Sequence, residues 1–235
     1  MINGKSILGI IPARGGSKGI PFKNIVDLNG KPLIAWSIEA SISCKYIDKT
    51  IVSTNDVKVK EISLESGAEV PFKRPEIYSR DKSTSFSVIE HALNWFKKHE
   101  QNFDIVVLLQ PTSPLRTSVD IDEALKYYLK INANAVISVC KSEHNPLWAN
   151  TLPTDFNMTN FLRKEISNKN RQQLPQFYRL NGAIYISDVN YFFENKGFLG
   201  KKTFAFIMPE ERSIDIDTET DLALSKILLA KHLQN

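Results

Sequence analysis

Apolar runs alternate with amphipathic segments along most of the chain. The runs lie at positions 6–12, 49–53, 105–109, 135–139, 182–187 and 204–207, with a shorter strand candidate at 69–71. Between them, apolar residues recur every three or four positions, which predicts helices over 32–43, 57–66, 83–99, 118–131 and 218–232. Strands separated by helices form parallel sheets with right-handed crossovers, so the pattern predicts a layered α/β fold with a mainly parallel sheet.

One of these runs, Ile105–Leu109, is apolar throughout, as expected of a central strand that is covered on both faces. In parallel sheets, ligands bind beyond the carboxyl ends of the strands. The loops that follow Pro12, Ser53 and Leu109 should therefore share one crevice.

The regular pattern stops between residues 142 and 180, where the chain is polar and rich in Pro, Asn and Gln. A disordered insertion is one interpretation. A packed accessory lobe that serves dimerisation is favoured by four aromatic residues: Trp148, Phe156, Phe161 and Phe177. We therefore predict a main domain of residues 1–141 and 181–235 with an inserted lobe of residues 142–180.

Composition narrows the class of protein. The 235 residues are 42% hydrophobic and 24% charged, as in ordinary globular proteins, and the net charge is only +4. A basic run with interleaved aromatics is missing, so we expect no nucleic-acid partner. The first apolar stretch, Ile7–Ile11, is too short to span a membrane, and no signal-peptide pattern is visible, which predicts a cytoplasmic protein. The two cysteines, Cys44 and Cys140, are expected to be buried free thiols.

The first apolar run leads into a loop of glycines and cations, ARGGSKGIPFKN, over residues 13–24. Its three glycines let backbone N–H groups approach an anion, while Arg14, Lys18 and Lys23 supply positive charge. The loop has neither the spacing of a Walker A motif nor that of a dinucleotide-binding GxGxxG turn. We predict a polyphosphate site here, with a solvated basic turn as the alternative.

A pair of carboxylates stands near the other end of the chain, in SIDIDTE. Asp215 and Asp217 are two residues apart, so in an extended segment both side chains point to the same side. Mg²⁺ prefers such oxygen ligands and completes its shell with water and substrate phosphates. Helix capping or a solvated acidic strand is the alternative interpretation, but together with a triphosphate loop the pair favours a metal site.

Two further loops carry side chains suited to a nucleotide. Gln110 follows the apolar run at 105–109, and the prolines of QPTSPLR fix the loop behind it, which favours a rigid contact to ribose or phosphate. A plain strand-to-helix turn is the alternative. The segment 73–85 offers Arg74 and several hydroxyls before a predicted helix, and we interpret Asp81 there as a local cap.

Five segments, in order along nearly the whole chain, resemble motifs of the CMP-sialic acid synthetase (acylneuraminate cytidylyltransferase) family: IPARGGSKGIPFKN, RPEIYSRDKSTS, LLQPTSPLR, RQQLPQFYRLNGAIYI and SIDIDTETDL. The resemblance implies a three-layer Rossmann-like nucleotidyltransferase fold with a small dimerisation lobe. It also implies a homodimer that uses Mg²⁺, with CTP and an acidic nine-carbon sugar of the sialic, legionaminic or pseudaminic acid type as substrates.

The same resemblance implies roles for single residues. The CTP phosphates are expected to contact Arg14, Ser17, Lys18 and Lys23. Asn24 and Gln110 are expected to lie near the ribose or the reacting centre, and Arg74 and Ser85 near the cytosine. Asp215 and Asp217 match the family's magnesium ligands, and with Arg14 and Lys23 they form the expected catalytic set. The sugar is expected to contact Gln110, Trp148, Arg171, Arg179, Tyr185 and Phe198, with Arg179 reaching across the dimer.

One departure bears on the sugar. Several members of the family have a lysine where this chain has Trp148, at the end of HNPLW, and the family's phenylalanine pair is here Phe198–Leu199. An indole in place of a cation favours a more apolar sugar, such as legionaminic or pseudaminic acid, over N-acetylneuraminic acid. A core tryptophan with unchanged specificity is the alternative.

The reaction that the resemblance implies is direct displacement at the α-phosphorus of CTP, in which positioning and charge neutralisation supply the catalysis. A synthetase for the eight-carbon sugar Kdo is the nearest alternative, although the GGSKG run and the RQQLP and NGAIYI segments favour the nine-carbon branch. A catalytically silent nucleotide-binding protein is the alternative from another class, and the intact pair Asp215 and Asp217 argues against it.

Overall fold

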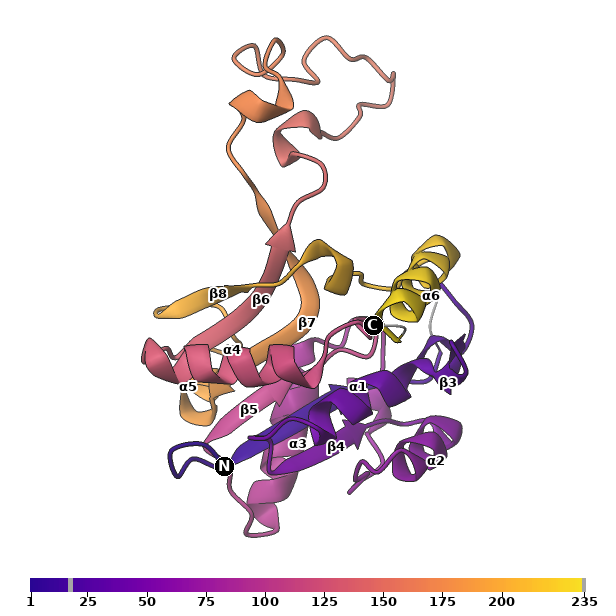
Figure 1. Cartoon of the computed structure of the whole chain (residues 1–235), viewed down its shortest axis with the longest axis vertical. Coiled ribbons are helices and arrows are strands. Elements are labelled where there is room, and N and C mark those ends of the chain that lie inside the picture. The colour runs from indigo at the N-terminus through magenta and orange to yellow at the C-terminus, as the bar shows by residue number, and fades with distance from the viewer. Residues whose placement is uncertain (17–18, 234–235) are drawn as a thin grey trace.

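The computed structural model describes residues 1–16 and 19–233, without the side chains of residues 232 and 233. At its centre is a six-stranded sheet in the order β4–β1–β5–β7–β6–β8 (Figure 1). Its strands are β1 (Ile7–Pro12), β4 (Lys49–Ser53), β5 (Ile105–Leu108), β6 (Ala135–Lys141), β7 (Tyr178–Asp188) and β8 (Thr203–Ile207). The helices are α1 (Leu33–Ile42), α2 (Val57–Glu65), α3 (Ser85–Lys98), α4 (Ser118–Lys130), α5 (Val189–Glu194) and α6 (Glu219–Leu233).

Strand β7 is the exception to a parallel sheet. β1 pairs in parallel with β4 and β5, and β6 pairs in parallel with β8, whereas β7 is antiparallel to both of its neighbours, β5 and β6. The prediction of a mainly parallel sheet is confirmed. The reversed strand arises because the chain leaves the sheet at the end of β6 and returns beside it.

Helices cover both faces of the sheet, which gives three layers. One face of the strands packs on α1, α2 and α4 through residues such as Ile34, Val59 and Leu125. The other packs on α3 and α5 through residues such as Phe96 and Phe192. In β1 the two faces alternate residue by residue, as expected of a strand buried on both sides.

A third apolar cluster places the two ends of the predicted site side by side. Ile20 lies within the glycine loop, and Leu28 lies in the two-residue strand β2 (Asp27–Leu28). Both belong to a cluster with Ile214, Ile216 and Leu222. Strand β2 pairs with β3 (Lys31–Pro32) in a small hairpin. Because Ile214 and Ile216 alternate with Asp215 and Asp217, burying the isoleucines fixes the aspartates beside the loop.

The predicted elements are largely present, with differences where the backbone is irregular. β7 begins at Tyr178, four residues before the predicted strand at 182–187. Its backbone is irregular where the two differ: Gly182 adopts φ +72°, and the pairing with β6 shifts register between Ile137 and Val139. Residues 69–71 form no strand; Glu69 makes a single bridge to β4. The hairpin β2–β3 and helix α5 were not predicted, although Asn29–Gly30 is a hairpin-turn signal.

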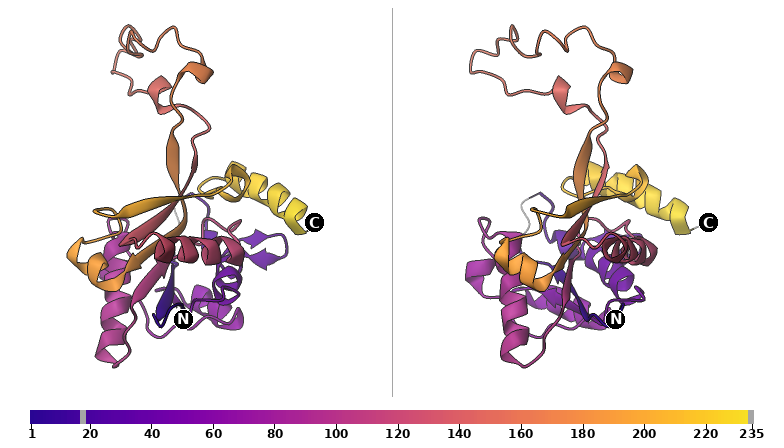
Figure 2. Two further views of the ribbon diagram at one scale, coloured as in Figure 1. Left: turned by 60° about the vertical axis from the view of Figure 1, so that its left-hand side comes forward. Right: turned by 90° about the vertical axis from the view of Figure 1, so that its left-hand side faces the viewer.

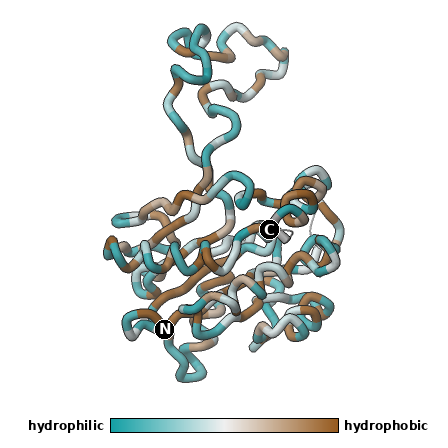
Figure 3. The backbone as a smooth tube through the Cα atoms, viewed as in Figure 1, coloured by the Kyte–Doolittle hydropathy of each residue, from teal (hydrophilic) through white to brown (hydrophobic). Residues whose placement is uncertain are grey.

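Residues 142–177 form an arm that projects from the ends of β6 and β7 (Figure 2). The arm is mostly hydrophilic, with isolated hydrophobic stretches (Figure 3). Of the four aromatic residues from which a packed lobe was predicted, Phe156 is 73% exposed and Trp148 is 36% exposed, whereas Phe161 and Phe177 are half-buried. The packed lobe therefore stays a prediction. Ile166 is buried on the arm.

Both cysteines are buried free thiols, as predicted. Within the described ranges, no helix has the length and apolar character needed to cross a bilayer.

Candidate active site

The glycine loop is anchored to the neighbouring loops at the carboxyl end of β1. Ala13 N–H donates to the Ser53 carbonyl at 2.9 Å, and Gly15 N–H donates to Asn55 Oδ1 at 3.0 Å. The loops after β1 and β4 therefore meet at one edge of the sheet, as the sequence predicted. Ser17 and Lys18, both predicted to contact phosphate, lie outside the described residues.

Two cations of the loop are held by carboxylates. Arg14 Nη1 donates to Asp81 Oδ1 at 2.8 Å and to the Ser79 carbonyl at 3.3 Å. Lys23 Nζ donates to Asp217 Oδ1 at 2.9 Å and to the Ile216 carbonyl at 2.7 Å. The Lys23 pair joins two regions 194 residues apart, the predicted phosphate loop and the predicted magnesium segment.

Two buried polar side chains, Asn24 and Arg74, hold backbone carbonyls of the glycine loop and of the neighbouring loops. Asn24 is buried, and its Nδ2 donates to the Arg14 carbonyl at 2.9 Å, so its amide shapes the loop. Arg74 is also buried, and its guanidinium donates to the carbonyls of Ser53 and Tyr78. Burial, together with the charge of Arg14, lowers the pKa of Arg74 to about 10. Ser85 is exposed at the start of α3.

The loop after β5 meets β7 at a tight corner. An added Cβ on Gly182 would lie 2.5 Å from Gln110 Oε1, 2.9 Å from Ser113 Oγ and 3.4 Å from Asp215 Oδ2. The Gln110 side chain therefore lies directly over Gly182, next to Asp215. The buried Asn181 fixes the corner: its carbonyl accepts from Ser113 Oγ at 2.9 Å, and its Nδ2 donates to Ser213 Oγ at 2.9 Å.

Asp215 and Asp217 line one cavity of about 490 Å³, at the root of the arm. Arg179 and His144 line the same cavity. Arg179 Nη2 also donates to the Ser213 carbonyl at 3.2 Å, so it reaches the aspartates of its own chain. The predicted contact of Arg179 across a dimer stays a prediction.

Asp215 is half-buried, and its Oδ1 has no hydrogen-bond partner. Burial raises the pKa of Asp215; the nearby Thr112 hydroxyl opposes this shift, and the charge of Asp217 adds to it. Burial raises the pKa of the Tyr185 phenol on β7, and the charge of the Asp215 carboxylate adds to this shift. Its ring packs on Phe198, at 5.4 Å between ring centroids, and Phe198 is itself buried in the core.

A magnesium ion would fit this pair. Asp215 presents a buried oxygen without a hydrogen-bond partner. Asp217 presents an exposed carboxylate that pairs with Lys23, and a lysine ammonium on a flexible stem can move aside for a metal ion. No cluster of three or more His, Cys, Asp or Glu side chains suited to a metal occurs among residues 1–16 and 19–231. The remaining ligands would therefore be waters and substrate phosphates, as is usual for Mg²⁺.

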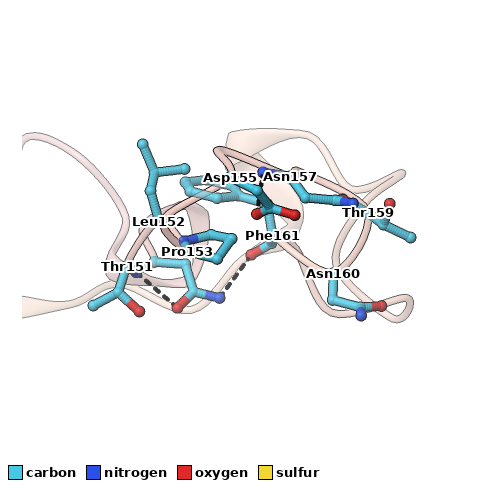
Figure 4. Close-up of a pocket in the computed structure, with 9 residues that line it drawn as sticks. Thr151, Leu152, Pro153, Asp155, Asn157, Thr159, Asn160 and Phe161 are labelled. Carbon is cyan, nitrogen blue, oxygen red and sulfur yellow. Dashed lines mark hydrogen bonds between the residues drawn. The ribbon is translucent and has the colours of Figure 1, made fainter.

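Two predicted sugar contacts lie on the arm instead of in this cavity. Trp148 ends the short 3₁₀ helix Pro146–Trp148, and Arg171 begins another, Arg171–Gln173. A separate cavity of about 590 Å³ lies farther along the arm, where Asn150 bonds across the loop to the Phe161 carbonyl (Figure 4). Neither Trp148 nor Arg171 lines it.

Comparison with known proteins adds the family. A family model described as cytidylyltransferase matches residues 8–227. The chain belongs to the cytidylyltransferase family.

Three relatives show which members of the family the chain is similar to. N-acylneuraminate cytidylyltransferase of Streptococcus agalactiae is 37% identical, over 90% of this chain and 50% of that protein. CMP-N,N'-diacetyllegionaminic acid synthase of Legionella pneumophila is 36% identical, over 95% of this chain and 96% of that protein. Pseudaminic acid cytidylyltransferase of Campylobacter jejuni is 32% identical, over 94% of this chain and 95% of that protein. The chain therefore spans about half the length of the N-acylneuraminate relative and nearly all of the other two.

Solved structures support the same fold. A CMP:2-keto-3-deoxy-manno-octonic acid synthetase in complex with CTP superposes with a TM-score of 0.70 at 17% identity, covering 97% of this chain and 99% of that one. A 4-diphosphocytidyl-2C-methyl-D-erythritol synthase from Anaerococcus prevotii superposes with a TM-score of 0.66 at 16% identity, covering 99% of this chain and all of that one. At such identities the likeness concerns the fold alone, and it confirms the predicted three-layer Rossmann-like architecture.

Sequence reasoning missed several residues of the cytidylyltransferase site. Asp81 pairs with Arg14 instead of serving only as a cap, and His144 lines the aspartate cavity. Asn181 and Gly182 form the corner beneath Gln110. The Asn–Gly pair inside an apolar strand was the available signal, because such a pair marks a bulge or a close backbone approach.

Proposed function

We propose that this cytidylyltransferase is a cytoplasmic, magnesium-dependent enzyme that joins CTP to an acidic nine-carbon 2-keto sugar and releases pyrophosphate. The observation that carries the proposal is the contact of Lys23 with Asp217, at 2.9 Å, beside the partnerless Asp215 oxygen. The contact brings a cation of the proposed phosphate loop next to the proposed metal carboxylates, which supports the two assignments together. The relatives with named sugar substrates support the same reaction class.

In the proposed reaction, the C2 hydroxyl of the sugar attacks the α-phosphorus of CTP in line. A bond forms between that oxygen and phosphorus, and the bond from phosphorus to the bridging oxygen breaks as pyrophosphate leaves. Arg14 exchanges Asp81 for a phosphate oxygen, and Lys23 neutralises charge on the leaving group. His144 lines the same cavity and is our candidate acceptor for the hydroxyl proton, since Asp215 and Asp217 are assigned to the metal.

Asp215 and Asp217 would hold Mg²⁺, which would supply positive charge to offset the negative charge of the phosphates. The protein's own contribution is to fix the two carboxylates. Ile214 and Ile216 bury on either side of Asp215, and Ile216 N–H donates to the Thr112 carbonyl at 2.8 Å. The carboxylates therefore need little rearrangement when the nucleotide arrives.

For the sugar, we propose a legionaminic or pseudaminic acid type. Trp148 stands where an ammonium group would pair with a sugar carboxylate in other members of the family, and an indole favours a sugar with deoxy positions and extra acyl groups. Arg179 remains as a cation in the aspartate cavity and is suited to the sugar carboxylate.

A substrate panel tests the function and the sugar together. CTP and Mg²⁺ are supplied with N-acetylneuraminic, legionaminic, pseudaminic or Kdo acid, and pyrophosphate release is followed. We expect the largest kcat/KM with legionaminic or pseudaminic acid. Preference for N-acetylneuraminic acid would contradict the role of Trp148, preference for Kdo would favour the eight-carbon alternative, and no release with any sugar would favour a silent nucleotide-binding protein.

We also propose a homodimer built on the arm, in which Trp148 and Arg171 approach the partner's site. Support comes from apolar side chains that a single chain leaves in water: Leu152 (53% exposed), Phe156 (73%) and Met158 (55%).

Phe156→Asp is expected to convert a dimer into a monomer in sedimentation experiments, because a charge buried in an apolar interface is costly. Asn160→Asp, at another exposed arm position, adds the same single negative charge and is the control. A wild-type monomer, or a variant that remains dimeric, would contradict the proposal.

A further inference from the structure

A buried arginine supports the loop that carries Gln110. Arg116 ends the QPTSPLR segment and is 2% exposed. Its Nη1 donates to the Gln110 carbonyl at 3.1 Å and to the Ala183 carbonyl at 3.0 Å. The Gln110 carbonyl belongs to the loop after β5, and the Ala183 carbonyl belongs to β7, directly after Gly182, against which the Gln110 side chain packs. A single nitrogen thus ties together the two backbone segments that form the corner.

Stability alone does not account for a cation at this position. Arg116 Nε and Nη2 are buried without hydrogen-bond partners, and burial lowers the pKa of the guanidinium to about 9. A buried charge whose donors are not all satisfied opposes folding, and an apolar side chain of similar size often fits such a position at lower cost. What an apolar side chain does not supply is a pair of bonds to two carbonyls.

Asp120 acts on Arg116 through its charge and on the aspartate segment through hydrogen bonds. The charge of Asp120 favours the charged form of Arg116. The Asp120 carboxylate in turn accepts from Arg212 Nε at 3.1 Å and Nη2 at 2.9 Å. Arg212 precedes Asp215 by three residues, and the segment returns to the same loop through the Ile216 N–H bond to the Thr112 carbonyl, at 2.8 Å. The aspartate segment therefore packs against the same loop that Arg116 ties to β7.

We propose that Arg116 is a positioning residue of the site: by tying the Gln110 loop to β7, it fixes the Gln110 amide relative to Asp215. The inference rests on the proposed cytidylyltransferase function, because it concerns how that site is held. Arg116 itself touches no substrate. Its planar guanidinium offers two donors in fixed directions from one nitrogen, whereas a lysine ammonium on a flexible stem does not hold both carbonyls in one geometry.

A double-mutant cycle separates positioning from general support. Arg116→Lys is expected to lower kcat/KM by roughly tenfold to a hundredfold, mainly through kcat, because a small misplacement of a positioned group costs rate at the chemical step. In the Gln110→Ala background the same change is expected to cost less than about twofold, because the group to be positioned is gone. An equal loss in both backgrounds would overturn the proposal and leave Arg116 a purely structural role.

A spectroscopic readout keeps the test independent of turnover. In protein labelled with ¹⁵N-glutamine, Arg116→Lys should shift or broaden the side-chain amide signal of Gln110, assigned through Gln110→Ala, while the signal of Gln172 on the arm stays in place. An unmoved Gln110 signal would overturn the proposal. Absence of turnover in the wild type would instead count against the proposed function alone.

Should Arg116→Lys fail to fold, Arg116→Met takes its place. Methionine has a comparable length and no charge, so it removes both bonds to the Gln110 and Ala183 carbonyls without burying a cation whose donors are unsatisfied. The Gln110 signal is again expected to shift or broaden. A folded Arg116→Met variant whose Gln110 signal stays in place would overturn the proposal.

Discussion

Replacing Asp215 by asparagine is expected to lower kcat for pyrophosphate release on the order of a thousandfold, which corresponds to about 4 kcal/mol of transition-state stabilisation. The change keeps the size of the side chain and removes the charge that would hold Mg²⁺ against the phosphates. CTP binding should weaken much less, since Arg14 and Lys23 remain. Steady-state pyrophosphate release at saturating CTP and sugar measures the effect.

The same variant should not lose stability. The Asp215 carboxylate is partly buried and one of its oxygens lacks a partner, so the folded protein holds this charge at a cost. Because burial raises the pKa of Asp215 above its ordinary value of 3.8, the cost is present at neutral pH and disappears as the pH falls through the folded-state pKa toward 3.8. Urea unfolding without Mg²⁺ should therefore find Asp215→Asn at least as stable as the wild type at pH 7, with the difference vanishing in acid.

Glu219→Gln is the matched control for Asp215→Asn. Glu219 lies in the first turn of α6, four residues farther along the chain, and its side chain is exposed. The control removes one negative charge from the same region and should leave kcat within about twofold of the wild type, because isolated surface charges have small effects. Equal rates for Asp215→Asn and Glu219→Gln would refute the assignment of the metal carboxylate.

Gly182→Ala is expected to reduce both stability and activity. A residue with a Cβ at φ +72° pays about 1–2 kcal/mol for the left-handed conformation. The new methyl would also lie 2.5 Å from Gln110 Oε1, and such overpacking costs about 1–3 kcal/mol more. Since the glutamine amide must move, kcat should fall together with the free energy of unfolding. Urea denaturation and pyrophosphate release report the two losses separately.

Gly30→Ala isolates the backbone part of this effect. Gly30 has φ +83° in the turn of the β2–β3 hairpin, and no atom lies within 4 Å of an added Cβ. It should lose about 1 kcal/mol and keep its activity. If Gly182→Ala behaved like Gly30→Ala, the Gln110 side chain would not depend on contact with the glycine.

Much of the fold could be predicted because apolar period and capping agree over its regular elements. The start of α2 is an example: its apolar period begins after Asp56, an N-cap residue type, and the Asp56 carboxylate accepts from Val59 N–H at 3.0 Å. The reversed direction of β7 could not be predicted, because apolar alternation is the same for parallel and antiparallel neighbours. Its early start was hidden as well, since Arg179, Asn181 and Gly182 interrupt the apolar run at the place where the strand meets the site.

The candidate site divides in the same way. Residues on short stretches of chain, such as Lys23 and Asp217, could be singled out from charge and spacing, and the structure brings them into contact. The partner of Arg14 could not, because the Arg14–Asp81 pair depends on how two loops 67 residues apart fold against each other. The buried supports, Asn181 and Arg116, carry no periodic signal and become visible only with the hydrogen bonds that they make.

The place where the arm joins the sheet has an evolutionary consequence. Lys141 and Tyr178 are directly paired across β6 and β7, so the arm begins and ends at adjacent points of a strand pair that would exist without it. Lengthening or replacing a loop closed in this way costs little free energy, since the closure term grows only with the logarithm of loop length. Residues on the arm, Trp148 among them, can therefore be exchanged without disturbing the loop at 13–24 or the aspartates. With the sugar contact proposed for Trp148, exchanging this one segment would change the sugar that is accepted.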